Sequence, residues 1–245
     1  MLDNISTTSQ RPLLVYNVSG SNSWYPYFIA NRPDAPGIIS ELLPKILHLA
    51  QINGKTIDLP PMRTNKALTT GMLDFDVVSP SWFANEDLGP EFVQSISIMS
   101  IAEHVVTLEK NLEQWRELDN IYGKEIGTIR GYLYHDDKQF TRFDFASEKE
   151  LVRALHRGRV EAVISGDYPA LYWSAQLKLP IKLAALHSQG FLVVRLRKEH
   201  QSFLPELNSA IKALKNDGVI DALIKKYTHP IEKVSASGEE IRKYD

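Results

Sequence analysis

The chain has 245 residues, with 28 Lys and Arg against 30 Asp and Glu, seven His and no Cys. Its 43% hydrophobic and 24% charged residues are typical of a folded globular protein, which excludes low-complexity, collagen-like and disordered chains. A net charge of −2 provides no basic field for phosphates, so we expect no nucleic-acid partner. The missing cysteines exclude disulfides, thiolate metal sites and cysteine nucleophiles.

No stretch of the sequence reaches the ~18–20 consecutive apolar residues that span a bilayer. The segment Met1–Pro12 is polar and lacks the basic start and apolar core of a secretory signal. Two locations stay open at this point: the cytoplasm, or an exported protein whose signal has been removed. The length predicts one or two domains.

The first half of the chain predicts a strand at Leu13–Tyr16 and a helix over 37–52, where apolar residues recur at helical spacing. Pro44 marks the first turn of this helix or kinks it, and the first case places the start near Leu43. Residues 95–108 are rich in β-branched side chains, which indicates an extended segment running from one half of the protein into the other.

The second half predicts an extended return segment at 190–194 and a helical region over 203–227, with a break at Asp217-Gly218. We expect the polar tail after His229 to be frayed. Trp115 and Trp173 lie on predicted helices, where core packing is the expected role.

The two halves also share a weak pattern. Gly54-Lys55-x-Ile57 is followed by Ala67-Leu68-x-x-Gly71-x-x-Asp74, and Gly123-Lys124-x-Ile126 by Ala154-Leu155-x-x-Gly158-x-x-Glu161. Each copy predicts strand, helix and strand, with the helix ending at a glycine, as in open and mostly parallel α/β sheets. The pattern indicates either two similar lobes or two unrelated units of the same kind.

Ligands bind at the carboxyl ends of the strands in open α/β sheets, because helix N-termini and free backbone N–H groups point there. The candidate ligand contacts that follow the predicted strands are Trp24, Tyr25, Tyr27, Arg63, Ser81, Trp82, Arg130, Gly131, Tyr132, Asp167 and Tyr168. Aromatic rings can stack on a flat or apolar ligand, and an arginine can clamp an acid. Packing in a loop stays open for the first three aromatics, a solvated surface role for Arg63, and helix capping for Asp167.

Catalytic and metal motifs are absent from the sequence. No His pair has metal-ligand spacing, and neither a nucleophile elbow nor a phosphate-binding loop occurs. Asp74-Phe75-Asp76 is the one pair of carboxylates that could hold a metal, but it begins a strand, so we expect it away from the cleft in a capping or loop role. We therefore predict a protein that is not an enzyme, with no catalytic residue, no metal and no cofactor.

Several pieces of the chain, in this order and spacing, resemble family 3 of the bacterial extracellular solute-binding proteins, the amino-acid-type periplasmic binding proteins. The pieces are Tyr25-Pro26-Tyr27, Gly71-x-x-Asp74, Gly123-Lys124-x-Ile126-Gly127 with Arg130-Gly131, Val160–Ile164 before Asp167, and Leu207–Gly218 with Ile224–Tyr227. The resemblance implies an α/β, two-lobed type II periplasmic-binding fold, in which each lobe is an open, mostly parallel sheet flanked by helices. It places lobe 1 at 1–100 plus 190–245 and lobe 2 at 101–189, with hinge motion near 98–105 and 185–190.

The resemblance further implies a periplasmic, monomeric protein whose signal was removed, and which closes on a small polar or aromatic solute for an ABC-type transporter. Family members usually hold the ligand α-carboxylate with an arginine in a Thr-x-x-Arg context. Here no arginine lies between Arg63 and Arg116, so Arg63 or Arg130 would have to replace it. Asp167 matches the acidic position that often binds the ligand ammonium group. Two alternatives remain: a sensory domain with a signalling partner, and a lyase that uses Asp167.

Overall fold

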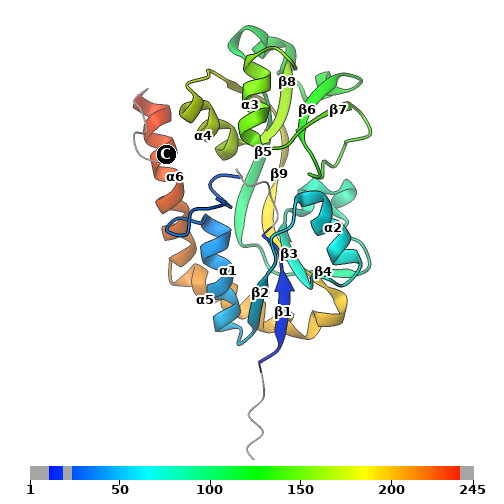
Figure 1. Cartoon of the computed structure of the whole chain (residues 1–245), viewed down its shortest axis with the longest axis vertical. Helices are drawn as coiled ribbons and strands as arrows, with labels where there is room; N and C mark the ends of the chain where they lie inside the picture. Colours follow the sequence, from blue (N-terminus) through cyan, green and yellow to red (C-terminus); the bar gives the residue numbers. More distant parts are fainter. Residues whose placement is uncertain (1–10, 19–23, 238–245) are drawn as a thin grey trace, which may run out of the picture.

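The protein is described by a computed structural model that covers residues 11–18 and 24–237. Two lobes lie one above the other, and the long strands β5 and β9 run through both (Figure 1). The strands are β1 (Leu13–Tyr16), β2 (Asn53–Thr56), β3 (Phe75–Val78), β4 (Phe92–Gln94), β5 (Met99–Thr107), β6 (Glu125–Ile129), β7 (Thr141–Phe145), β8 (Ala162–Gly166) and β9 (Lys182–Arg197). The α-helices are α1 (Ile38–Leu49), α2 (Pro61–Thr69), α3 (Glu148–His156), α4 (Asp167–Leu177), α5 (Leu204–Asn216) and α6 (Val219–Ser237).

The sheet has the strand order β2-β1-β3-β9-β5-β8-β6-β7, and β4 pairs with β9. β1 is parallel to β2 and β3 in one lobe, and β6 is parallel to β7 and β8 in the other. β5 and β9 run antiparallel to each other and to their neighbours β8 and β3. The extended segments expected at 95–108 and 190–194 are therefore the strands that join the lobes, and the α/β prediction is confirmed. The exact lobe boundaries stay a prediction.

Helix α1 begins at Ile38 although Pro44 lies inside it, so the start near Leu43 is wrong. A proline within a helix costs about 3 kcal/mol because it removes a hydrogen bond and crowds the preceding turn. The helix nevertheless buries a full apolar face against the lobe-1 core, worth about 1.5–3 kcal/mol for each side chain. The buried residues are Ile38, Ile39, Leu42, Leu43, Ile46 and Leu47.

The repeated pattern of the sequence matches equivalent elements only in its second part. The Ala-Leu helices are α2 and α3, and each leads into the third strand of its lobe, β3 or β8. The Gly-Lys pieces fall on strands that are not equivalent, because β2 lies at one edge of the sheet whereas β6 lies between β7 and β8. The lobes are thus similar in topology, but the first half of the pattern aligns a central strand with an edge strand.

The C-terminal helices join the lobes a third time. The predicted break at Asp217-Gly218 is confirmed, since α5 ends at Asn216 and α6 begins at Val219. α6 packs against α1 and α5 of lobe 1 and against α4 of lobe 2, and it runs alongside both lobes (Figure 1). The helix continues to Ser237, so the fraying expected after His229 is wrong for that stretch.

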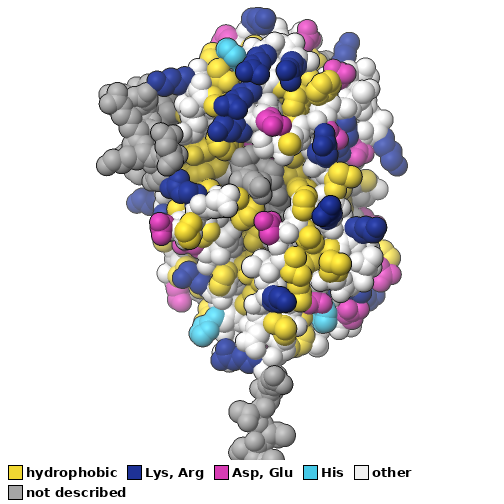
Figure 2. Space-filling model, in the orientation of Figure 1, with side chains coloured by type: hydrophobic (Ala, Val, Ile, Leu, Met, Phe, Trp, Pro, Cys, Tyr) yellow, Lys and Arg dark blue, Asp and Glu magenta, His cyan; other side chains and the backbone are white. Residues whose placement is uncertain are grey.

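No helix in the described part of the chain is long and apolar enough to cross a membrane. Charged side chains of both signs cover the face in Figure 2, and basic side chains gather at the top, over α3. In the sequence of α3 and its C-cap, Lys149, Arg153 and Arg157 recur every four residues, which places them along one side of the helix. Lobe 2 therefore carries a local stripe of positive charge, although the net charge of the chain is only −2.

Candidate functional site

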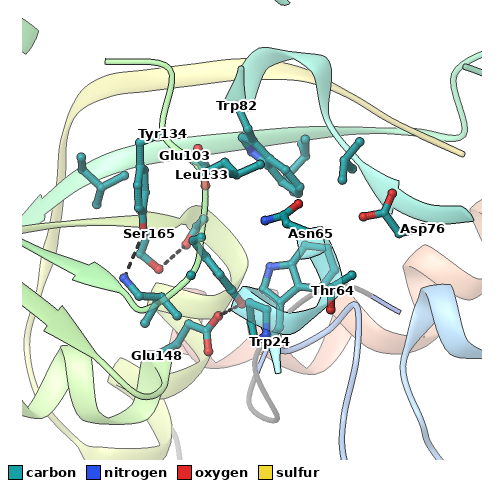
Figure 3. Close-up of a pocket in the computed structure, with 18 residues that line it drawn as sticks. Trp24, Thr64, Asn65, Asp76, Trp82, Glu103, Leu133, Tyr134, Glu148 and Ser165 are labelled. Atoms are coloured by element: carbon teal, nitrogen blue, oxygen red, sulfur yellow. Dashed lines mark hydrogen bonds between the residues drawn. The ribbon is translucent and has the colours of Figure 1, made fainter. Parts of the chain in front are cut away.

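A cavity of about 700 Å³, counting its opening to solvent, lies between the two lobes. In Figure 3, Trp24, Asn65 and Trp82 lie on one side of this cavity and Tyr134, Glu148 and Ser165 on the other. The lining residues are Trp24, Pro61, Thr64, Asn65, Asp76, Val78, Trp82, Ile101, Glu103, Ile129, Gly131, Tyr132, Leu133, Tyr134, Glu148, Ile164, Ser165 and Gly166.

Two tryptophans form the lobe-1 wall. Trp24 and Trp82 meet edge to face, with ring centroids 6.1 Å apart, and Trp24 also packs on Tyr27. The Trp24 loop is held by the start of α1, because the N–H groups of Ile38 and Ile39 donate to the carbonyls of Pro26 and Tyr27. These bonds satisfy helix N–H groups that would otherwise lack partners. The wall is therefore fixed by the fold of lobe 1.

The lobe-2 wall is the turn after β6, which carries Gly131, Tyr132 and Tyr134. The Tyr132 hydroxyl donates to Glu148 Oε1 at 2.6 Å, and the backbone N–H of Ile129 donates to the Tyr134 hydroxyl at 3.0 Å. Arg142 donates to the carbonyls of Ile129 and Tyr132 at 2.9 and 3.0 Å. The turn is thus tied down on both sides and presents two aromatic rings to the cavity.

Gly131 brings the lobes into contact. Its φ of +84° lies in the left-handed region, and a Cβ at this position would lie 2.6 Å from the backbone nitrogen of Met62 in α2. Only glycine permits both this backbone angle and this approach. The lobes are consequently closed around the cavity on this side.

Three carboxylates line the cavity, and each has a partner. Asp76 is bound by Arg195, whose Nε and Nη2 donate at 2.9 and 2.7 Å. Glu148 accepts the Tyr132 hydroxyl, and Glu103 accepts the Ser188 hydroxyl at 2.7 Å. Among the described residues that line the cavity there is no Lys or Arg. Glu103 also lies 3.7 Å from the imidazole of His187. Burial opposes protonation of this imidazole, but Asp136 and Glu103 outweigh it and raise its pKa to about 9. The three carboxylates of the lining thus stand against two basic groups behind it, Arg195 and His187, so the site still favours positive charge.

Of the residues predicted from the sequence, Trp24, Trp82, Gly131 and Tyr132 line this cavity. Arg63 and Arg130 are exposed and are not among its lining residues. Ser81 is buried beside Gly190 and shares a 2.8 Å hydrogen bond with Ser79, at the crossing strands. Ligand contact by all of these remains a prediction, because position alone does not establish binding.

The other predicted contacts lie behind the cavity. Tyr25 stacks on Tyr172 of α4 at 3.6 Å, and its hydroxyl donates to the carbonyl of Tyr227. Tyr27 is fully buried in the lobe-1 core. Asp167 begins α4 and accepts the N–H of Tyr168 at 2.7 Å, and burial raises the pKa of its carboxyl. Tyr168 is partly buried and packs against the lobe-1 core.

The expectation that the Asp74–Asp76 motif lies away from the cleft is wrong for Asp76, which lines the cavity. Asp76 and Val78 lie two residues apart on the same face of β3, and both line the cavity, so the face of the strand mattered more than the distance of Asp76 from the strand end. Asp74 instead accepts the N–H of Val15 at 2.6 Å and pairs with His200 at 2.9 Å.

Glu103 was also missed, although a signal existed: a carboxylate within the apolar run Ile101–Val106 is seldom buried without a partner. Glu148 was missed because it lies at the start of a helix, where an acidic residue has an ordinary capping explanation. Thr64 and Asn65 are direct neighbours of the predicted Arg63, but helical periodicity turns a different side of α2 to the cavity.

This architecture, two α/β lobes joined by crossing strands with a cavity between them, is the type II periplasmic-binding fold. Solved structures of that fold match nearly the whole chain. They include a mutant of ArgBP from T. maritima (18% identity, TM-score 0.70, covering 88% of this chain and 94% of that one). The GluR0 ligand-binding core from Nostoc punctiforme, solved with L-glutamate, matches with 17% identity, TM-score 0.69 and coverages of 88% and 98%.

A third match is AbpA from Streptococcus pneumoniae, an amino acid ABC transporter substrate-binding protein bound to L-arginine, with 15% identity, TM-score 0.68 and coverages of 88% and 94%. No family model matches the sequence, and no curated protein matches it. The likeness confirms the fold that the sequence resemblance implied.

Proposed function

We propose that this protein is a periplasmic solute-binding protein that closes on one small solute and delivers it to an ABC-type transporter. The observation that carries the proposal is the cavity whose two walls come from different lobes. A cavity of this kind is completed by closure, so occupancy changes the shape that a membrane partner meets. The neighbours of the same fold include an amino acid ABC transporter substrate-binding protein. We propose binding without catalysis, by a monomer.

The solute we propose has an apolar or flat body and a positively charged amino or ammonium group. The ring faces of tryptophan and tyrosine attract cations. Each cation–π contact contributes about 0.5–2 kcal/mol of binding free energy, and more as water is excluded. Trp24, Trp82, Tyr132 and Tyr134 supply such faces, and Glu103 supplies the opposite charge.

A ligand α-carboxylate would find no cation among the described residues that line this cavity, because Arg63 and Arg130 are both outside its lining. Arg195 lies behind Asp76 and is already engaged by it in two hydrogen bonds. A buried carboxylate without a cation or several N–H donors is costly. This supports a solute that is not held by its carboxylate, in contrast to the usual α-amino-acid arrangement.

The test is a thermal-shift and calorimetric titration with matched pairs that differ by one carboxylate: agmatine and L-arginine, putrescine and L-ornithine, tyramine and L-tyrosine. A binder at a hundredfold excess over its Kd stabilises the native state by about 2.7 kcal/mol. We expect the amine of at least one pair to bind and its amino acid to bind more weakly. A carboxylated partner that binds more tightly refutes the charge assignment, and a silent panel refutes solute binding of this class.

A pair of charge-neutralising variants localises the response. Glu103→Gln removes the charge inside the cavity, whereas Glu125→Gln removes an exposed one at the start of β6. We expect the first to weaken amine binding and the second to leave it unchanged. Equal effects of the two would place the binding elsewhere.

A further inference from the structure

A second polar cluster lies beside the cavity, on the far side of Glu103. His135 and Asp136 belong to the loop between β6 and β7, and His187 belongs to β9. One donor atom from each lies within 4.8 Å of the others. The side chains of His187 and Asp136 are 0% and 3% exposed, and that of His135 is 30% exposed, so the cluster is buried at one end and open at the other.

A β-bulge turns His187 into this cluster. Along β9, Ser188 pairs with Glu103 and Leu186 pairs with His104, so His187 is the extra residue between two consecutive partners on β5. A bulge re-aims one side chain and leaves it outside the ladder. The His187 ring consequently stacks on that of His135, with centroids 4.7 Å apart.

An outer hydrogen bond orients the imidazole of His135, and a carboxylate lies near the outer nitrogen of His187. His135 Nε2 lies 3.1 Å from the carbonyl oxygen of His187, and because a carbonyl only accepts, Nε2 is the donor, which in the neutral ring leaves the lone pair on Nδ1. That Nδ1 faces Asp136 Oδ1 at 4.0 Å. On the other ring, Glu103 Oε2 lies 3.7 Å from His187 Nδ1, too far for a hydrogen bond, so this buried nitrogen has a nearby carboxylate but no hydrogen-bond partner among the described residues. Histidines that bind metals are commonly held in this way by a carbonyl or a carboxylate.

The cluster is not fully satisfied without a ligand. His187 Nε2 lies 2.9 Å from Asp136 Oδ1, but Asp136 Oδ2 is buried and has no hydrogen-bond partner among the described residues. Burial of Asp136 Oδ2 without a hydrogen bond costs desolvation free energy, and the contact of His187 with Oδ1 does not offset that cost.

We propose that His135, Asp136 and His187 form a binding site for a divalent transition-metal ion, with Zn²⁺ as the best-matched ion. Two imidazole nitrogens and one carboxylate oxygen are a zinc ligand set, with bond lengths of about 2.0–2.2 Å, and water supplies the fourth position. The open side at His135 is the entry path. The spacing of these residues hid the site from the sequence, since the bulge brings together two histidines that lie far apart in the chain.

The other mixed cluster, Asp74, Glu199 and His200, supplies a matched control. Its members already have partners: His200 Nε2 binds Asp74 at 2.9 Å, and Glu199 is bound by Arg197 at 2.9 Å. His200→Ala therefore tests whether any histidine near acids would bind the ion.

The experiment titrates Zn²⁺ into the full chain after chelator treatment, with calorimetry for stoichiometry and the visible spectrum of the Co²⁺ form for coordination. We expect one equivalent bound by the wild type, at least about tenfold weaker binding by His135→Ala, and unchanged binding by His200→Ala. His135 is partly exposed, so its variant should fold, which circular dichroism checks. Failure of the wild type to bind, equal binding by His135→Ala, or a loss in His200→Ala would each overturn the proposal. The titration is done without solute, so its outcome is independent of the proposed function.

Discussion

The ion pair between Arg195 and Asp76 permits the sharpest stability prediction. The two side chains are 4% and 1% exposed, and the guanidinium makes two hydrogen bonds to the carboxylate. Arg195 also lies over the rings of Phe83 and Phe92, about 5 Å from each centroid (5.2 and 5.0 Å). Arg195→Met keeps much of the packing volume but leaves Asp76 charged and buried.

Breaking a buried pair in this way costs about 3–5 kcal/mol, a large part of the ~5–15 kcal/mol that stabilises a typical domain. The measurement is urea unfolding at neutral pH, with the free energy extrapolated to water. Arg116→Met is the control, because Arg116 pairs with Glu113 at the surface and should contribute less than about 1 kcal/mol.

Adding Asp76→Val to Arg195→Met also removes the buried carboxylate that has lost its arginine, so the double variant should recover most of the lost stability. A cost below about 1 kcal/mol for Arg195→Met alone, the value expected of an exposed pair, would refute the reasoning. A double variant with a lower free energy of unfolding than Arg195→Met alone would also refute the reasoning.

Three further predictions concern the cavity and its frame. Trp82→Ala should raise the calorimetric Kd of the tightest-binding amine of the panel by about tenfold, because a cation–π contact and part of the apolar wall are lost. An unchanged Kd would show that Trp82 does not contact the solute. Gly131→Ala should oppose closure of the two lobes, because the added Cβ would collide with Met62. The backbone angle at this position also costs a residue other than glycine about 1–2 kcal/mol. Small-angle scattering with solute present should show a larger radius of gyration for the variant than for the wild type, and equal radii would contradict this. Burial opposes ionisation of Glu41, but hydrogen bonds from α6 outweigh it and lower the pKa of its carboxyl. Its stabilisation is thus present above the unfolded pKa of 4.5 and lost as pH falls through the lower folded value. Glu41→Gln should destabilise at pH 7 and lose that difference in acid, whereas the exposed Glu206→Gln should show no such pH dependence.

Periodicity predicted most of the fold, because burial of apolar faces dominates the choice of element. The joining strands were recognisable from β-branched runs, and the helix break from Asp217-Gly218. Pro44 shows the limit of local rules: six buried side chains on α1 outweigh one lost hydrogen bond. Strand pairing order was likewise not contained in the Gly-Lys pattern, since edge and central strands can carry the same local sequence.

The cavity was predicted in part, where its residues follow strand ends. Trp24, Trp82, Gly131 and Tyr132 were found in this way. Glu103 lies in the middle of a strand, and only the pleat and the neighbouring lobe bring it to the cavity. The His187 cluster depends on a bulge, a one-residue irregularity that no hydrophobic pattern reports.

The central claim is that the cavity binds a positively charged solute through Glu103. The most direct measurement is a calorimetric titration of the best amine of the matched panel into the wild type and into Glu103→Gln, at the same pH and ionic strength. A hydrogen-bonded charge pair contributes about 1.5–3 kcal/mol, so we predict a Kd at least about tenfold higher in the variant, with one site per chain. The same Kd in both proteins would contradict the account.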